Sequence, residues 1–158
     1  MDTLKKILSM PIPEWNRWVD WHARTLKDEE SKMLAQLKDG IYSGVDFSFR
    51  NLCHCDFSDS SITNTSFRFC IIRGAQFRNC QITNCDFSNA LLMGDDLAKA
   101  AIKGCNFHDS MIYECNFEGA TIAESDFNRS DICSGSLKSM DYLNLFILVT
   151  RLRRFLKV

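Results

Sequence analysis

Apolar residues recur at every fifth position from Phe47 to Leu137, without a single insertion or deletion. All nineteen of these positions hold Phe, Leu or Ile. A small residue usually stands two places earlier, and Asp or Asn often stands between the two, as in Cys85-Asp86-Phe87. A period of five fits neither the period of about 3.6 of a helix nor that of about two of a strand. The pattern therefore predicts a solenoid built from one short repeated unit.

The repeat resembles the pentapeptide-repeat family, whose unit is written A-(D/N)-(L/F)-X-X. The resemblance covers about 95 of the 158 residues. It implies a right-handed quadrilateral parallel β-helix, in which four units form one coil and the central residue points inward. Coils stack at the strand spacing of about 4.8 Å, so the nineteen units predict a rod about 23 Å long. The predicted fold is an all-β solenoid with N-terminal and C-terminal helices, divided into a helical cap (1–44), a β-helix (45–139) and a capping or dimerisation helix (140–158).

The interior of this solenoid follows from the same register. Phe alternates with Ile or Leu, so two opposite sides should carry Phe. Six cysteines occupy the small inward position and should act as small buried apolar residues, whereas Cys53 and Cys133 should point outward. Asp95 places a carboxylate at an inward position, which predicts a bulge or a hydrogen bond to a turn. Arg50 breaks the pattern in the first coil, where its side chain could escape the open end. The six inward cysteines are Cys55, Cys70, Cys80, Cys85, Cys105 and Cys115.

One side of the predicted square carries an outward apolar column. The residues before the central position read Asn51, Ile71, Leu91, Met111 and Asp131 on this side. An apolar patch of this kind marks a binding surface unless another part of the chain covers it. Either the Trp-bearing N-terminal helix packs over the column, or a partner protein or second copy binds there. The candidate partner surface comprises Ile71, Leu91, Met93, Met111, Tyr113 and Arg73.

Residues outside the repeat predict helices at both ends. Trp15, Trp18 and Val19 recur at helical spacing, and Gly40 stands where a helix would stop. The three Trp residues indicate an amphipathic helix that covers a core, with an aromatic ligand box as the alternative. Asp28-Glu29-Glu30 interrupts the apolar stripe, so two shorter helices with a bend are also possible.

The tail, residues 140–158, predicts an amphipathic helix with basic residues near its C-terminus. It is too short and too basic to span a bilayer. Its apolar stripe exceeds what one coil end can cover, which predicts a homodimer. The resemblance implies the same, because quinolone-resistance members that protect DNA gyrase end in a dimerising helix. A basic helix lying on an anionic membrane is the alternative. The candidate dimer residues are Leu145, Phe146, Leu148, Val149, Leu152 and Phe155.

Two short clusters carry residue types used in metal binding or catalysis. Cys53-His54-Cys55 has metal-ligand types, but neighbouring residues point to different sides and the next coil supplies no fourth ligand. His108-Asp109-Ser110 has catalytic types, but it lies on an open polar face without a predicted cleft or orienting carboxylate. We therefore predict no enzyme, no metal and no cofactor.

Charge and composition limit the classes of partner and the cellular location that we expect. The formal net charge is -1, and residues 45–139 carry eight basic and twelve acidic side chains. This balance argues against direct binding of nucleic acid. The eight cysteines, without a recognisable secretion signal, predict reduced thiols and a cytoplasmic location. Secretion as an effector by a signal-less route stays open.

These observations favour a non-enzymatic interaction module, a scaffold or an effector that binds a protein through the β-helix surface. A DNA-mimicking modulator or protector of a type II topoisomerase is the alternative, supported by the rod shape, the acidic repeat and the predicted dimer. The basic side chains among the acids and the short rod argue against it. A membrane-associated effector acting through the tail is a further alternative.

Overall fold

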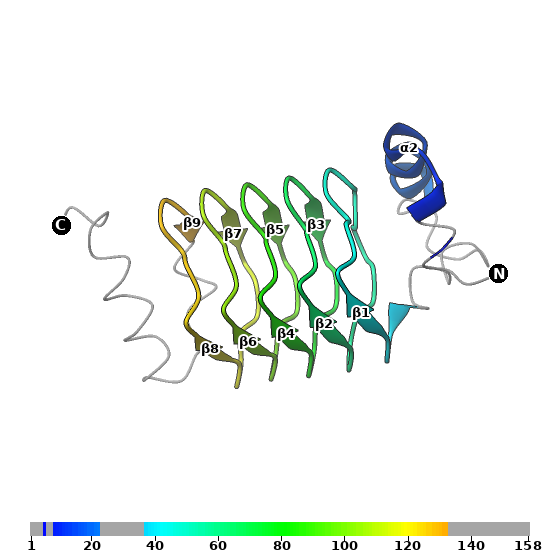
Figure 1. The fold of residues 1–158 in the computed structure, drawn as a ribbon. Coiled ribbons are helices and arrows are strands. Elements are labelled where there is room, and N and C mark those ends of the chain that lie inside the picture. Colours follow the sequence, from blue (N-terminus) through cyan, green and yellow to red (C-terminus); the bar gives the residue numbers. More distant parts are fainter. Residues whose placement is uncertain (1–4, 6–7, 23–36, 133–158) are drawn as a thin grey trace.

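The computed structural model describes residue 5 and residues 8–22 and 37–132, and from residue 41 onward these form one rod of stacked coils (Figure 1). Two parallel sheets of five and four strands run along opposite sides of the rod. The larger sheet contains β1 (Ile41–Ser43), β2 (Ser61–Thr63), β4 (Gln81–Thr83), β6 (Ala101–Lys103) and β8 (Thr121–Ala123). The smaller sheet contains β3 (Ile71–Arg73), β5 (Leu91–Met93), β7 (Met111–Tyr113) and β9 (Asp131–Ile132). The predicted β-solenoid with parallel sheets is confirmed.

Neighbouring coils are in register at an offset of twenty residues. Leu92 pairs with Ile112 in the smaller sheet, and the pairs of the larger sheet have the same offset. The two remaining sides are joined by single parallel bridges, such as Asp86 with Asn106. Each coil therefore has four sides, and no inserted loop breaks the register between residues 41 and 132.

The corners of the coil depend on residues with left-handed backbone. On the Phe-bearing sides the fourth residue donates its amide to the carbonyl of the first, as Arg50 N does to Phe47 O at 3.1 Å. The third residue has positive φ, which is the geometry of a type II turn. Of the nineteen described residues with positive φ, twelve are Gly, Asn or Asp, which adopt this conformation at least cost. Phe49 (φ 64°) and Phe69 (φ 55°) are among the exceptions.

Phenylalanine rings stack along two opposite sides of the interior. Phe87 lies between Phe67 and Phe107, with ring centroids 4.6 and 4.8 Å away and interplanar angles of 6° and 3°. On the facing side Phe57 stacks on Phe77 at 5.1 Å, and it meets Phe67 edge to face. All five side chains are at most 1% exposed. The predicted register and the predicted pairing of Phe sides are confirmed.

The cysteines and the buried aspartate follow this register with one correction. All six inward cysteines are buried free thiols. Cys53, predicted to point outward, is buried as well and belongs to the same apolar core as Trp15 and Val19 of the N-terminal helix. Burial raises the pKa of Cys53 to about 11 and that of Cys70 to about 12. Asp95 causes no bulge, since the offset of twenty residues continues through Asp96, and its carboxylate accepts hydrogen bonds from the amides of Ala75 and Met93.

The N-terminal helix α2 (Ile12–His22) closes the first coil at the edge of the smaller sheet. Trp15 Nε1 donates to the carbonyl oxygen of Asn51 at 2.7 Å. The Asn16 side chain accepts from the amide of Asn51 at 2.7 Å and donates to the carbonyl oxygen of Phe49 at 3.1 Å. These side chains satisfy backbone groups that another coil would otherwise pair, as a solenoid cap must.

Two further expectations about this end need correction. The solenoid begins at Ile41, not at residue 45, because β1 pairs with β2 and Tyr42 occupies the central inward position. Tyr is absent from the Phe, Leu and Ile set that defines the repeat, so the pattern missed this unit. Arg50 does not reach solvent: it is 6% exposed and donates to the carbonyl oxygen of Met10 at 3.2 Å.

Several predictions fall on residues outside the described part of the chain. These include residues 23–36 of the predicted N-terminal helices, Cys133, and the whole C-terminal helix 140–158 with its six candidate dimer residues. Among the described residues, no helix is both long enough and apolar enough to cross a bilayer.

Candidate protein-binding face

The six residues of the predicted partner surface lie together on the smaller sheet. Ile71 is in register with Leu91 and Met111, and Arg73 is in register with Met93 and Tyr113. The strand geometry explains this, because residues on either side of an inward residue both point outward. We call the outward side of β3, β5, β7 and β9 the upper face, after its position in Figure 1.

Three consecutive residues of the first column on the upper face are apolar, and the outer two of the three are open to solvent. Ile71 is 42% exposed and Met111 is 43% exposed, while Leu91 between them is half-buried. Tyr113 is half-buried and its hydroxyl donates to Asp131 Oδ2 at 2.6 Å. Isolated exposed apolar residues are normal, but a stacked column of them is typical of a binding surface.

Helix α2 does not cover Ile71 or Met111, contrary to one of the two expectations. It docks at Asn51, which lies at the N-terminal end of the column. The docking site is determined by unpaired backbone groups at the sheet edge, because a buried amide or carbonyl without a partner is costly. Ile71 and Met111 therefore keep more than two fifths of their surface exposed.

Sequence reasoning missed two exposed aromatic residues at the corner beside this face. The rings of Phe49 and Phe69 stack at 4.9 Å with an interplanar angle of 4°. They are 55% and 42% exposed, and the Arg68 guanidinium carbon lies 5.7 Å from the centroid of Phe69. Bulky side chains at positive φ are uncommon, and such strain is often kept at functional sites. The available signal was Phe at a turn position where Gly, Asn and Asp predominate.

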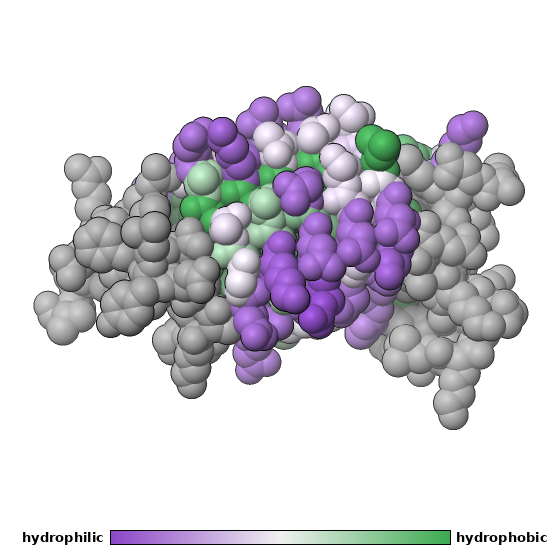
Figure 2. Space-filling view, turned by 90° about the horizontal axis from the view of Figure 1, so that it is seen from below, coloured by the Kyte–Doolittle hydropathy of each residue, from purple (hydrophilic) through white to green (hydrophobic). Residues whose placement is uncertain are grey.

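The opposite face has a different character. Figure 2 shows it from below: hydrophilic and neutral side chains cover most of the face, and green appears in narrow areas between them and in one protruding spot toward the right end. Its outward strand positions include Ser61, Gln81 and Thr121. Ile41, at the N-terminal end of β1, is the exception and is 83% exposed. The apolar column is therefore a property of the upper face and not of the solenoid in general.

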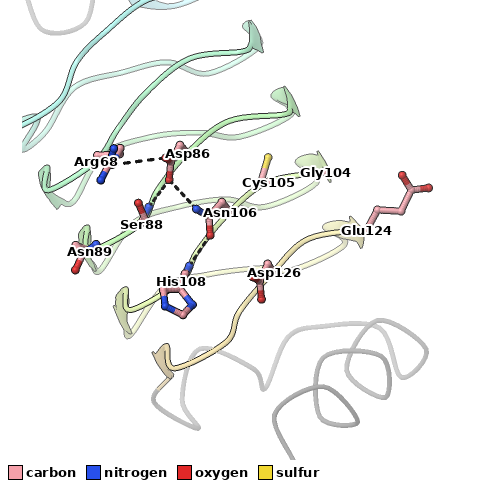
Figure 3. Close-up of a pocket in the computed structure, with 10 residues that line it drawn as sticks. All are labelled: Arg68, Asp86, Ser88, Asn89, Gly104, Cys105, Asn106, His108, Glu124 and Asp126. Atoms are coloured by element: carbon pink, nitrogen blue, oxygen red, sulfur yellow. Dashed lines mark hydrogen bonds and ion pairs between the residues drawn. The ribbon is translucent and has the colours of Figure 1, made fainter.

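A shallow polar groove of about 580 Å³ lies on the side that carries Phe87 and Phe107 inside. Figure 3 shows its side chains as a ladder across neighbouring coils. Asn106 Nδ2 donates to Asp86 Oδ1 at 3.1 Å, and the amides of Ser88 and His108 donate to the side chains of Asp86 and Asn106. Most of these polar groups therefore brace the turns of their own coils.

The His108-Asp109-Ser110 cluster does not assemble a nucleophile and a base. Asp109 is held by His108 Nε2 at 2.9 Å and by Arg129 Nε at 2.8 Å. Ser110 occupies the inward position at 1% exposure, and its hydroxyl oxygen has no hydrogen-bond partner among the described residues. A catalytic serine needs a base within hydrogen-bond reach, and this geometry does not provide one.

The cysteines and acidic residues are not arranged around a common centre. Within the described ranges, no group of three or more His, Cys, Asp or Glu side chains could hold a metal ion. Cys53 and Cys55 flank His54 in the sequence, but both thiols are buried whereas His54 is exposed.

Comparison with known proteins supports the repeat. The model of pentapeptide repeats matches residues 43–75 and 70–109, and no curated protein matches the chain by sequence. HetL from the cyanobacterium Nostoc sp. strain PCC 7120, a protein involved in regulating heterocyst differentiation, has a similar structure, with a TM-score of 0.55 and 13% identity over 58% of this chain. The match spans 44% of HetL, less than half of its length.

Two further solved structures are similar. Rfr23 from the cyanobacterium Cyanothece 51142 has a TM-score of 0.53 and 12% identity, over 65% of this chain and 88% of Rfr23. QnrB1, a plasmid-mediated fluoroquinolone resistance protein, has 16% identity over 73% of this chain and 69% of QnrB1, but its TM-score of 0.39 is too low to argue from. Repeat pattern, register and structural neighbours agree: residues 43–109 match the pentapeptide-repeat family, and the described solenoid has the fold of solved pentapeptide-repeat proteins.

Proposed function

We propose that this protein is a non-enzymatic interaction module that binds a partner protein through the upper face. The observation that carries the proposal is the exposure of Ile71 and Met111 on one flat sheet, in register with Leu91. Apolar side chains at such positions lose favourable burial unless a partner covers them. A polar residue at each would serve the solenoid equally well, as the opposite face demonstrates.

The corner beside the face adds a second line of support. Phe49 and Phe69 stand in left-handed backbone, where Asn or Gly would fold at lower cost. Phe69 stands only two residues before Ile71 in the chain, and its ring stacks on that of Phe49. Aromatic side chains are enriched among the residues that contribute most to binding at protein interfaces.

Replacement of Leu91 by Lys should abolish capture of the partner without loss of fold. A lysine in the middle of the apolar column would have to lose its hydration on binding, which is unfavourable. The measurement is affinity capture with the intact protein, followed by mass spectrometry of retained proteins and a melting curve of each variant. Gln81→Lys is the matched control, because Gln81 holds the same strand position on the opposite face.

The two variants must differ for the proposal to hold. Equal capture by wild type and Leu91→Lys would remove the upper face as the binding site. A much lower melting temperature of Leu91→Lys alone would mean that Leu91 serves stability.

A DNA-mimicking modulator of a type II topoisomerase is a second candidate, favoured by the charge of the C-terminal half of the described solenoid. Residues 86–131 carry nine acidic and three basic side chains, and Asp86, Glu124 and Asp126 line the polar groove. A dense row of carboxylates can take the place of duplex phosphates on a basic surface. Supercoiling by a type II topoisomerase, with and without a quinolone, tests this candidate; unchanged inhibition by the drug would count against it.

The tail remains a prediction in both cases. Its proposed contacts, with a second copy or with an anionic membrane, involve residues outside the described ranges, as does most of its basic charge. A cytoplasmic location likewise stays a prediction.

A further inference from the structure

We propose that the partner of the upper face is a second copy of this chain, packed face to face and antiparallel. This inference rests on the proposed function, because it names the partner of the same surface. Under one particular two-fold rotation, Arg73 and Glu114 beside the apolar column come to face each other across the two copies.

Two charged side chains stand on either side of the central strand β5. Arg73 ends β3, one coil before β5, and Glu114 follows β7, one coil after β5. Both are exposed, and neither forms an ion pair with another residue that the structure describes. The residues equivalent to Glu114 in the two preceding coils are Gly94 and Gly74. The Glu114 carboxylate is therefore the only charged group at this corner position in these three coils.

A two-fold axis along β5 brings these charges together. With this axis the two rods run in opposite directions, and each outward column packs against the same column of the second copy. Strand β3 of one copy therefore faces β7 of the other. Ile71 then faces Met111 of the second copy, and Arg73 faces Tyr113 and Glu114. Leu91 and Met93, on the central strand, each face the same residue of the second copy. The three apolar residues of the column thus meet apolar residues, and Arg73 meets Glu114, as an isologous interface requires, while Asn51 at one end of the column faces Asp131.

The parallel arrangement is worse on the same residues. A two-fold axis along the rod would exchange the two columns at each level. Arg73 would then face Ile71, and Glu114 would approach the corner of Asp109, whose carboxylate is already held by His108 and Arg129. An unpaired cation on an apolar residue disfavours association, and the already paired Asp109 offers no cation to Glu114. The charges therefore select the antiparallel dimer.

Sedimentation velocity of the full-length protein over a range of concentrations tests this arrangement. We expect a wild-type dimer with micromolar affinity, since the face is small. Arg73→Glu and Glu114→Arg should each weaken the dimer by about tenfold, because each creates two like-charge contacts across the axis. The double variant should restore the wild-type affinity. A long charged side chain is acceptable at position 114, because Glu114 itself already has a φ of 54° there.

Controls separate this inference from the proposed function. Lys103→Glu makes a similar charge change on the opposite face and should leave the dimer unchanged. A monomeric wild type that still captures another protein, in a manner sensitive to Leu91→Lys, would overturn the second copy as partner while the binding face stands. A dimer unaffected by both charge variants but lost in Phe146→Glu would place the contact in the tail and overturn the proposal.

Discussion

Replacement of Phe87 by Ala should lower the free energy of unfolding by about 3–5 kcal/mol, the usual loss for a fully buried Phe. Its ring is 1% exposed and stacks between Phe67 and Phe107 at 4.6 and 4.8 Å. A coil contacts only its neighbours, so a cavity in the middle of the stack weakens two coil interfaces at once. Urea unfolding followed by circular dichroism measures the loss.

Phe69→Asn is the matched control for this substitution. It also removes a phenyl ring, but from a residue that is 42% exposed and has a φ of 55°. Asn adopts that conformation more readily than Phe, so the control should change stability by less than about 1 kcal/mol. Equal losses in the two variants would contradict the assigned register.

The stability of the wild type should fall as pH rises through about 7, because of Asp95. The carboxylate is 1% exposed and accepts hydrogen bonds from the amides of Ala75 at 2.8 Å and Met93 at 3.0 Å. Burial raises the pKa of Asp95 to about 7, against the bonds from the two amides, which lower it. The folded state therefore holds the proton more tightly than the unfolded chain, whose Asp has a pKa near 3.8.

The sign and size of the effect follow from linkage. The stabilising contribution is fully present below about pH 4 and is lost as pH rises through about 7. The difference between a pKa of about 7 in the folded state and 3.8 in the unfolded chain corresponds to about 4 kcal/mol of unfolding free energy. Asp46 and Asp59 have lowered pKa values, caused first by hydrogen bonds from Ser48 and Asn79. These two carboxylates therefore stabilise the fold more as pH rises, which opposes the effect of Asp95. The informative quantity is therefore the difference between wild type and an Asp95 variant.

Asp95→Ser should be more stable than wild type at pH 8, and the difference should shrink toward pH 4.5. Ser fits this position, because Ser125 Oγ accepts the amide of Cys105 at 3.1 Å at an equivalent inward corner. The converse variant, Ser125→Asp, should introduce a loss of stability above pH 7. Urea unfolding at the two pH values measures both. Parallel pH profiles of wild type and Asp95→Ser would show that Asp95 does not titrate with folding.

Much of the fold was predictable because a solenoid converts local spacing into tertiary contacts. A residue and its neighbour twenty positions later occupy the same place on adjacent coils, so the period of five determines which side chains stack. The inward Phe rows, the buried cysteines and the register of Ile71, Leu91 and Met111 all follow from that period. The same period predicted that Arg73 lies beside the apolar column.

The sequence by itself thus determined the repeat, its inward positions and the composition of each outward column. Only the tertiary structure decided how the first coil is closed. The contacts of Trp15 and Asn16 with Asn51 and Phe49 join residues more than thirty positions apart and obey no period. The burial of Cys53 and Arg50 and the open upper face follow from that docking. A period specifies contacts between equivalent residues, whereas the end of a solenoid is covered by whatever side chains satisfy its unpaired amides and carbonyls.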